Sequence, residues 1–261
     1  MDAGGKRPIA ITKEKEFCIL SLSGGAMLLK YFGLASMILM ITISNSHRTE
    51  AQSRDSARKN SELATRVIKD VALEGQLWDL LTRLSLDYDI PLGLEVSADE
   101  QRSNRYRVEL SEGTIADLMS QIISQNERYD WLIENGVVNV FPREKYRDTF
   151  LTELLTVRIR RFAINKNSDC WALQNDLITI PEIRAVVDAH GMQSIAADFT
   201  GFYIPQLGRN FSLKFSDTTL KALLNRIIRE SPLARTWIIS ADNSSRTLNL
   251  RVTSRQHETS H

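Results

Sequence analysis

Two stretches of the chain, about a hundred residues apart, share one pattern of apolar positions. Each opens with apolar residues at every second position, which predicts a strand with one buried face, and then changes to helical spacing. Residues 106–123 and 211–228 match at a constant offset of 105. The strand positions are Tyr106, Val108, Leu110 and Phe211, Leu213, Phe215; the helix positions are Ile115, Leu118, Met119, Ile122, Ile123 and Leu220, Leu223, Leu224, Ile227, Ile228.

Each predicted helix begins after a threonine and is followed by a pair of predicted strands. Thr114 and Thr219 are the expected N-caps, because a hydroxyl there can accept a hydrogen bond from a first-turn N–H. The first strand pair starts at Trp131 and turns at Asn135-Gly136, a dipeptide that favours a tight hairpin. The second starts at Trp237 and has a polar turn over residues 241–246.

Further elements precede each copy of this pattern. Apolar spacing predicts a helix over residues 77–88, ended by Pro91 and Gly93, and another over residues 180–187, ended by His190 and Gly191. Alternation predicts an opening strand within residues 154–164, with a weaker counterpart in residues 65–73. The expected class is therefore α+β, with two tandem small β-α-β-β-α-β-β modules after an N-terminal signal or anchor segment. Each module is expected to bury its helices on a small sheet of its own.

The N-terminal region has the layout of an export signal. Lys30 precedes an apolar run from Phe32 to Ile43, and polar, small residues follow up to Ala51. Residues 1–51 are expected to be a signal peptide or a retained membrane anchor, and Met27 is a possible start of translation. Residues 52–62 are polar and predict a solvated linker. The first module is then expected over 63–150, the second over 151–252, and a polar tail over 253–261.

The repeated pattern resembles a known family. The resemblance rests on four segments: Leu77 to Leu84, Asp87 to Leu94, Val108 to Met119 and the hairpin at Trp131. They resemble the short N-terminal domain of secretins and TonB-dependent receptors. The resemblance covers residues 65–141 and, less closely, 157–252. It implies compact periplasmic modules that dock onto other envelope proteins, without catalysis; the chain differs from the family in that only a polar tail follows Val252.

Composition and charge narrow the class of partner. The 261 residues are 43% hydrophobic and 25% charged, so the chain can bury a core. The formal net charge is +1, so the chain has no strong overall electrostatic field that would attract nucleic acid or an anionic membrane.

The two cysteines, Cys18 and Cys170, lie on opposite sides of the expected cleavage site. A cleaved chain would therefore hold one thiol and no internal disulfide.

The sequence contains no residue pattern that predicts a catalytic, metal or cofactor site. Cys170 has no Cys-x-x-Cys partner and is expected to be a buried structural thiol. His190 is expected to bond helix-terminal carbonyls; His47, His257 and His261 lie outside the predicted modules. Carboxylate pairs are expected to be solvated in turns: Asp87 with Asp89, and Asp99 with Glu100. The densest basic spot consists of Arg158, Arg160 and Arg161. It is expected to be a solvated strand face and not an RNA-binding site, because the sequence lacks the Gly-x-x-Gly clamp of a KH-like RNA binder.

These observations predict a non-enzymatic, exported interaction or assembly module of the bacterial cell envelope. It is expected in the periplasm, or anchored in the inner membrane and facing the periplasm, with no cofactor, no nucleic acid and envelope protein partners whose identity and binding residues the sequence does not specify. The alternative is a small-ligand-binding protein that uses a cleft between the two modules. The tryptophans that could line this cleft are Trp78, Trp131, Trp171 and Trp237.

Overall fold

The chain folds as a mixed α+β protein. The computed structural model describes residues 54–96, 104–166, 168–195, 207–208 and 210–255, and these begin with a helical segment over residues 54–65. We call residues 67–142 the first half. Its elements are β1 (Val67–Gly75), α2 (Leu77–Tyr88), β2 (Leu92–Val96), β3 (Tyr106–Thr114), α3 (Ile115–Ile123), β4 (Tyr129–Glu134) and β5 (Val137–Pro142).

A short 3-10 helix, η1 (Glu144–Tyr146), leads into the second half, residues 149–254. Its elements are α4 (Thr149–Thr156), β6 (Arg158–Ile164), α5 (Cys170–Thr179), α6 (Pro181–Ala189), β7 (Gln193–Ile195), β8 (Leu213–Thr219), α7 (Leu220–Glu230), β9 (Ala234–Asp242) and β10 (Thr247–Ser254).

A six-stranded sheet runs through both halves in the order β4-β5-β2-β9-β10-β7. In the first half β4 and β5 form an antiparallel hairpin, and β2 adds parallel to β5. In the second half β9 and β10 form an antiparallel hairpin, and β7 adds parallel to β10. The halves are joined because β2 also pairs in parallel with β9, over Leu92–Val96 and Thr236–Ser240.

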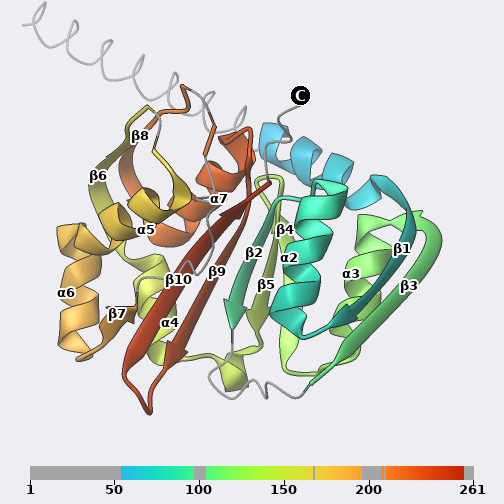
Figure 1. Cartoon of the computed structure of the whole chain (residues 1–261), viewed down its shortest axis with the longest axis horizontal. Coiled ribbons are helices and arrows are strands. Elements are labelled where there is room, and N and C mark those ends of the chain that lie inside the picture. The colour runs from blue at the N-terminus through green and yellow to red at the C-terminus, as the bar shows by residue number, and fades with distance from the viewer. Residues whose placement is uncertain (1–53, 97–103, 167, 196–206, 209, 256–261) are drawn as a thin grey trace, which may run out of the picture. The chain divides into compact units, whose positions relative to one another are not determined.

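Two smaller sheets lie beyond the helices. β1 pairs antiparallel with β3, and β6 pairs antiparallel with β8. The first of these sheets packs on α2 and α3, and the second packs on α6 and α7. In Figure 1 the β1–β3 sheet and the β6–β8 sheet accordingly lie at opposite ends, with helices between each of them and the central strands.

Two hydrophobic clusters lie on opposite faces of the six-stranded sheet. The smaller cluster contains the buried residues of α2 and α3 together with Leu92 and Leu94 of β2. The larger contains the buried residues of α4 to α7 together with Trp237 and Ile239 of β9. Leu94 is paired with Ile238 and Gly93 with Trp237, so alternate residues along the two strands face different clusters. Each half therefore covers the opposite side of a shared sheet.

Much of the local structure follows the sequence pattern. The helices predicted over 77–88, 115–123, 180–187 and 220–228 are present as α2, α3, α6 and α7. Thr114 accepts a hydrogen bond from the backbone N–H of Asp117 at 3.1 Å, and Thr219 accepts one from Ala222 at 3.2 Å, which confirms both N-caps. Asn135 and Gly136 both have positive φ, as a tight hairpin of this type requires.

The solvated linker expected over residues 52–62 overlaps a helix, residues 54–65, whose side chains other than Leu63 are exposed or half-buried. Three expectations are wrong. The strand expected from residue 154 begins only at Arg158, because residues 149–156 form α4, capped by Asp148. Helix α5 was not predicted; its weakly amphipathic sequence hides it, although Asp169 caps it through the N–H of Ala172. The expected separate sheets of two modules are instead joined through β2 and β9.

The join depends on a glycine. Gly93 lies directly opposite Trp237 across the β2–β9 pairing, and a Cβ built on Gly93 would lie 2.2 Å from Cε2 of the indole ring. A side chain at position 93 would therefore displace a tryptophan that is 1% exposed and donates from Nε1 to Oδ1 of Asn225 at 2.8 Å. This is the use of a strand glycine that allows close approach of a neighbouring group.

We predict that Gly93→Ala lowers the free energy of unfolding by about 1–3 kcal/mol or more, because overpacking forces the indole out of its place. Equilibrium urea denaturation measures the change. Gly75→Ala is the matched control, because a Cβ there would meet only Cβ of Asp79 at 3.7 Å. Equal stability of the two variants would show that the indole has room to move.

Candidate functional site: the junction between the halves

Helices from both halves cross the β2–β9 junction. α2 packs on β9 from one face, and α7 packs on β2 and β5 from the other face. Polar contacts tie α7 to the β4–β5 hairpin, since Lys221 Nζ lies 3.0 Å from Oε2 of Glu134 and Arg229 Nη1 donates to the carbonyl of Asn135 at 3.1 Å. Each half also contributes an apolar side chain to the core of the other half: Ile238 of β9 belongs to the smaller cluster, and Val137 of β5 belongs to the larger one.

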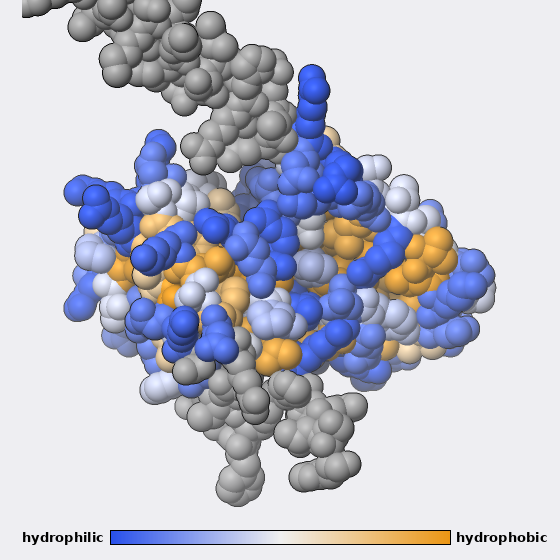
Figure 2. All heavy atoms as spheres, turned by 90° about the horizontal axis from the view of Figure 1, so that it is seen from above, coloured by the Kyte–Doolittle hydropathy of each residue, from blue (hydrophilic) through white to orange (hydrophobic). Residues whose placement is uncertain are grey.

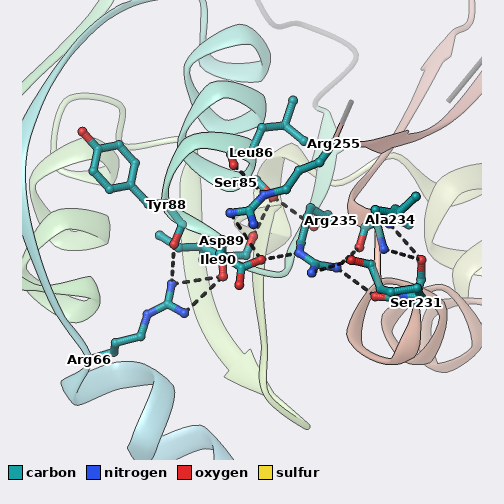
Figure 3. Close-up of polar contacts among 12 residues, drawn as sticks. Arg66, Ser85, Leu86, Tyr88, Asp89, Ile90, Ser231, Ala234, Arg235 and Arg255 are labelled. Atoms are coloured by element: carbon teal, nitrogen blue, oxygen red, sulfur yellow. Dashed lines mark hydrogen bonds and ion pairs between the residues drawn. The ribbon is translucent and has the colours of Figure 1, made fainter. Parts of the chain in front are cut away.

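Arginines gather at the C-terminal end of α2, where the junction meets the surface (Figure 3). Arg66 donates to the carbonyls of Tyr88 and Asp89 at 2.8 and 3.1 Å, and Arg255 donates to the carbonyl of Leu86 at 2.9 Å. These carbonyls lack partners within the helix and carry the negative end of its dipole, so cations are favoured there.

The carboxylate of Asp89 lies at the centre of this cluster. It accepts a hydrogen bond from Arg235 Nε and lies 3.5 Å from Nη2 of Arg255, so one residue of the first half pairs with Arg235 of the second half and with Arg255, which directly follows that half. Asp89 has φ 56° and ψ 44°, a left-handed conformation that ends α2 and that aspartate tolerates better than most residues. The guanidinium of Arg235 also donates to the carbonyls of Ser231 and Pro232.

Buried Ser85 links the same two halves through the backbone. Its hydroxyl donates to the carbonyl of Ile90 at 2.6 Å and lies 3.0 Å from the carbonyl of Arg235 (Figure 3). Together with the arginines it satisfies polar groups at the end of α2. The cluster therefore has the chemistry of a structural clamp: its donors are directed at carbonyls and one carboxylate of the chain itself.

A buried carboxylate lies on the other face of the junction strands. Glu95 of β2 is 7% exposed, and its Oε1 has no hydrogen-bond partner among the described residues. Oδ1 of Asn139, on the same face of neighbouring β5, is likewise without one. Burial raises the pKa of Glu95, against the opposing effect of Arg147 and Lys221.

The structure separates the residues singled out by sequence. Cys170 is free and buried as expected, and burial raises the pKa of its thiol to about 12, which leaves it unreactive at neutral pH. His190 does follow α6, but its Nε2 pairs with Oε2 of Glu153 at 2.8 Å instead of with helix carbonyls. Asp87 lies within α2 and not in a turn, so it and Asp89 are not a solvated loop pair.

The basic spot and the tryptophans do not form a site. Arg158 pairs with Asp217 and Arg160 with Glu182 on exposed β6, as expected for a solvated strand face. Trp237 is buried in the larger cluster and Trp131 packs against the smaller. The other two are exposed, and their helices pack on opposite faces of the sheet: Trp78 on α2 and Trp171 on α5. The four indoles do not line one cleft.

Several expectations concern residues outside the described part of the chain. These are the leader with Lys30 and Cys18, the carboxylates Asp99 and Glu100, and the histidines His47, His257 and His261. Over the described residues, none of the helices is long and apolar enough to cross a membrane, and no group of three or more His, Cys, Asp or Glu side chains could hold a metal ion.

Sequence reasoning missed the residues that form the junction. The sequence pattern predicts Gly93 only as the end of a helix, although a glycine inside a strand can also mark the close approach of a neighbouring group. Nothing local indicated that Asp89, Arg235 and Arg255 meet, because about 146 residues separate Asp89 from Arg235.

On the part of the surface that Figure 2 leaves uncovered, apolar areas are separated by hydrophilic side chains. No protein-family description, curated protein or solved structure matches the chain.

We predict that Ser85→Ala lowers the free energy of unfolding by about 1–3 kcal/mol, because buried carbonyls lose their donor. Thr82→Ala, one turn earlier on the exposed side of α2, is the control and should change stability little, since the Thr82 hydroxyl bonds only the helix carbonyl of Trp78. Urea denaturation of both variants measures the difference. If Ser85→Ala leaves the free energy of unfolding unchanged, the prediction is wrong and water replaces the hydroxyl.

We predict that Glu95→Gln stabilises the fold at pH 8 more than at pH 4. A raised native pKa means that the folded chain holds the proton longer than the unfolded chain, so stability falls as pH rises above the ordinary value of 4.5; glutamine does not titrate and lacks this loss. Denaturation at several pH values tests this, with exposed Glu144→Gln as control. A pH-independent effect would contradict the assignment.

Proposed function

We propose that the chain is an exported, non-enzymatic interaction and assembly module of the bacterial cell envelope, built from two tandem copies of one β-α-β-β-α-β-β unit. The observation that carries the proposal is the β2–β9 junction, in which one copy docks on the other by adding a strand to its sheet. A unit that already binds its neighbour through a sheet edge is suited to strand addition with a partner.

The strand pairings support the reading as two copies. β4-β5-β2 and β9-β10-β7 have the same sequence of antiparallel and then parallel pairing. Each copy also has a two-stranded sheet, β1–β3 or β6–β8. A helix capped by a threonine directly follows the second strand of this sheet: α3 follows β3, and α7 follows β8. A helix also precedes the first strand of each copy, over residues 54–65 and as α4, and the second copy differs by the additional helix α5.

Two further features favour a binding role over catalysis. The arginines at the end of α2 bond the carboxylate of Asp89 or backbone carbonyls, and these contacts account for their positions without reference to a substrate. The buried thiol of Cys170 has a pKa raised to about 12, and His190 pairs with exposed Glu153. The apolar run over Phe32 to Ile43 supports export to the periplasm, either free or with an inner-membrane anchor.

Site-specific photocrosslinking in intact cells tests the proposal. We expect a benzophenone amino acid at Leu132, on β4 at the end of the sheet, to form adducts with protein in the envelope fraction, because the outer edge of β4 pairs with no other described strand. Trp171 on α5 is the control, since it is also apolar and exposed but lies on a helix. Recovery of the chain in the cytoplasm, or equal adducts from both positions, would overturn the proposal.

A further inference from the structure

We propose that a second copy of this chain binds at the edge of β4 that pairs with no other described strand, adding its β7 strand in parallel and continuing the sheet head to tail. The inference rests on the proposed function, because it names the partner of the same strand-addition surface. It is carried by the junction inside the chain, which supplies a template for the contact between chains.

Both ends of the six-stranded sheet present a strand edge without a partner among the described strands: β4 at one end and β7 at the other. Inside the chain, the strand that pairs with β9 is β2, and β2 and β7 occupy the same place, parallel to the second strand of the hairpin in their own halves. Likewise β4 and β9 are each the first strand of a hairpin. The edges at the two ends are therefore the two complementary sides of the β2–β9 junction.

An exposed leucine marks the receiving edge. Trp237 of β9 is followed by Ile238, which is buried in the cluster of the neighbouring half. Trp131 of β4 is followed by Leu132, which in the same way faces away from the core of its own half but is 40% exposed. A large apolar side chain on an edge strand favours association. A strand and its helices from another copy would cover Leu132 as the first half covers Ile238.

The helix next to this edge has room for the neighbour. On α7 the side chains of Lys221 and Arg229, eight residues apart on one ridge, contact the β4–β5 hairpin across the junction. The repeat offset of 105 places Ala116 and Ser124 at the matching positions of α3, where both are small and Ser124 is exposed. Small residues on this ridge allow a second chain to approach closely.

The geometry of the junction predicts an open assembly. Because the helices of the two halves cover opposite faces of the sheet, the halves are related by a half-turn about an axis across the strands combined with a translation along that axis. Repeating this operation does not close on itself. Each added chain would extend the sheet by six strands, roughly 29 Å at a strand spacing of about 4.8 Å, with a rotation from sheet twist.

Cysteine crosslinking of the full chain tests the arrangement. In a Cys18→Ser background, differently tagged chains carrying Leu132→Cys or Gln193→Cys are mixed and treated with a bismaleimide. Its spacer is about 17 Å long, because the register of the β2–β9 junction places Gln193 about five residues before the position opposite Leu132, at about 3.3 Å per residue. We expect the 132–193 adduct to exceed, by about tenfold or more, the adduct of Leu132→Cys with Arg161→Cys on exposed β6, because docking raises the local concentration. Chains with both Leu132→Cys and Gln193→Cys should give a ladder of oligomers.

Sedimentation velocity of the full chain gives an independent readout. We expect self-association that increases with concentration and is lost in Leu132→Lys, because a lysine on an edge strand opposes pairing. Val67→Lys, on an exposed position of β1, should leave it unchanged. Circular dichroism and urea denaturation show whether each variant remains folded.

The outcomes separate this inference from the proposed function. A dominant 132–132 adduct would replace the head-to-tail arrangement by a symmetric dimer, and a chain that stays monomeric at all concentrations would overturn self-association. If the chain is monomeric while Leu132 still crosslinks to a different envelope protein in cells, the inference fails and the proposed function stands. Absence of every adduct at Leu132 would overturn both.

Discussion

The parallel pairing of β2 with β9 is the constraint on which the rest of the structure depends. It requires a residue without a side chain at position 93, because the indole of Trp237 occupies the space where a Cβ would lie. With this contact the two hairpins and their third strands become one sheet, and each hydrophobic cluster gains a residue from the other half. Without it, each half would expose a strand edge and part of its core.

The pairing also decides where polar groups can be placed. Because α2 ends against the second half, its part-buried terminal carbonyls accept hydrogen bonds from Arg66 and Arg255, and the carboxylate of Asp89 pairs with Arg235 and Arg255. On the other face of β2 a polar group is buried without a partner. Glu95 points toward the side covered by α7, where a carboxylate loses its hydration and burial raises its pKa. The structure thus contains one polar cluster that stabilises the junction and one buried acid that opposes it.

The way in which the sheet is assembled, by adding a strand of one half to the edge of the other, bears on function more than the side-chain chemistry does. Main-chain hydrogen bonds provide affinity at a sheet edge, and the side chains beside the edge select the partner. In this chain the same kind of contact is used once internally, while β4 retains an edge with an exposed leucine. The assembly role that we propose extends a contact the chain makes with itself.

The sequence alone determined the local structure: the strand and helix periods of the repeat, the caps at Thr114 and Thr219, and the tight turn at Asn135-Gly136. These depend on residues a few positions apart, so the pattern contains the information. Helix α5 escaped because its burial comes from packing against β10 and not from a clear apolar stripe. The junction was decided only in three dimensions, since Gly93 and Trp237, or Asp89 and Arg235, lie more than a hundred residues apart and no local pattern records which sheet edge a strand will choose.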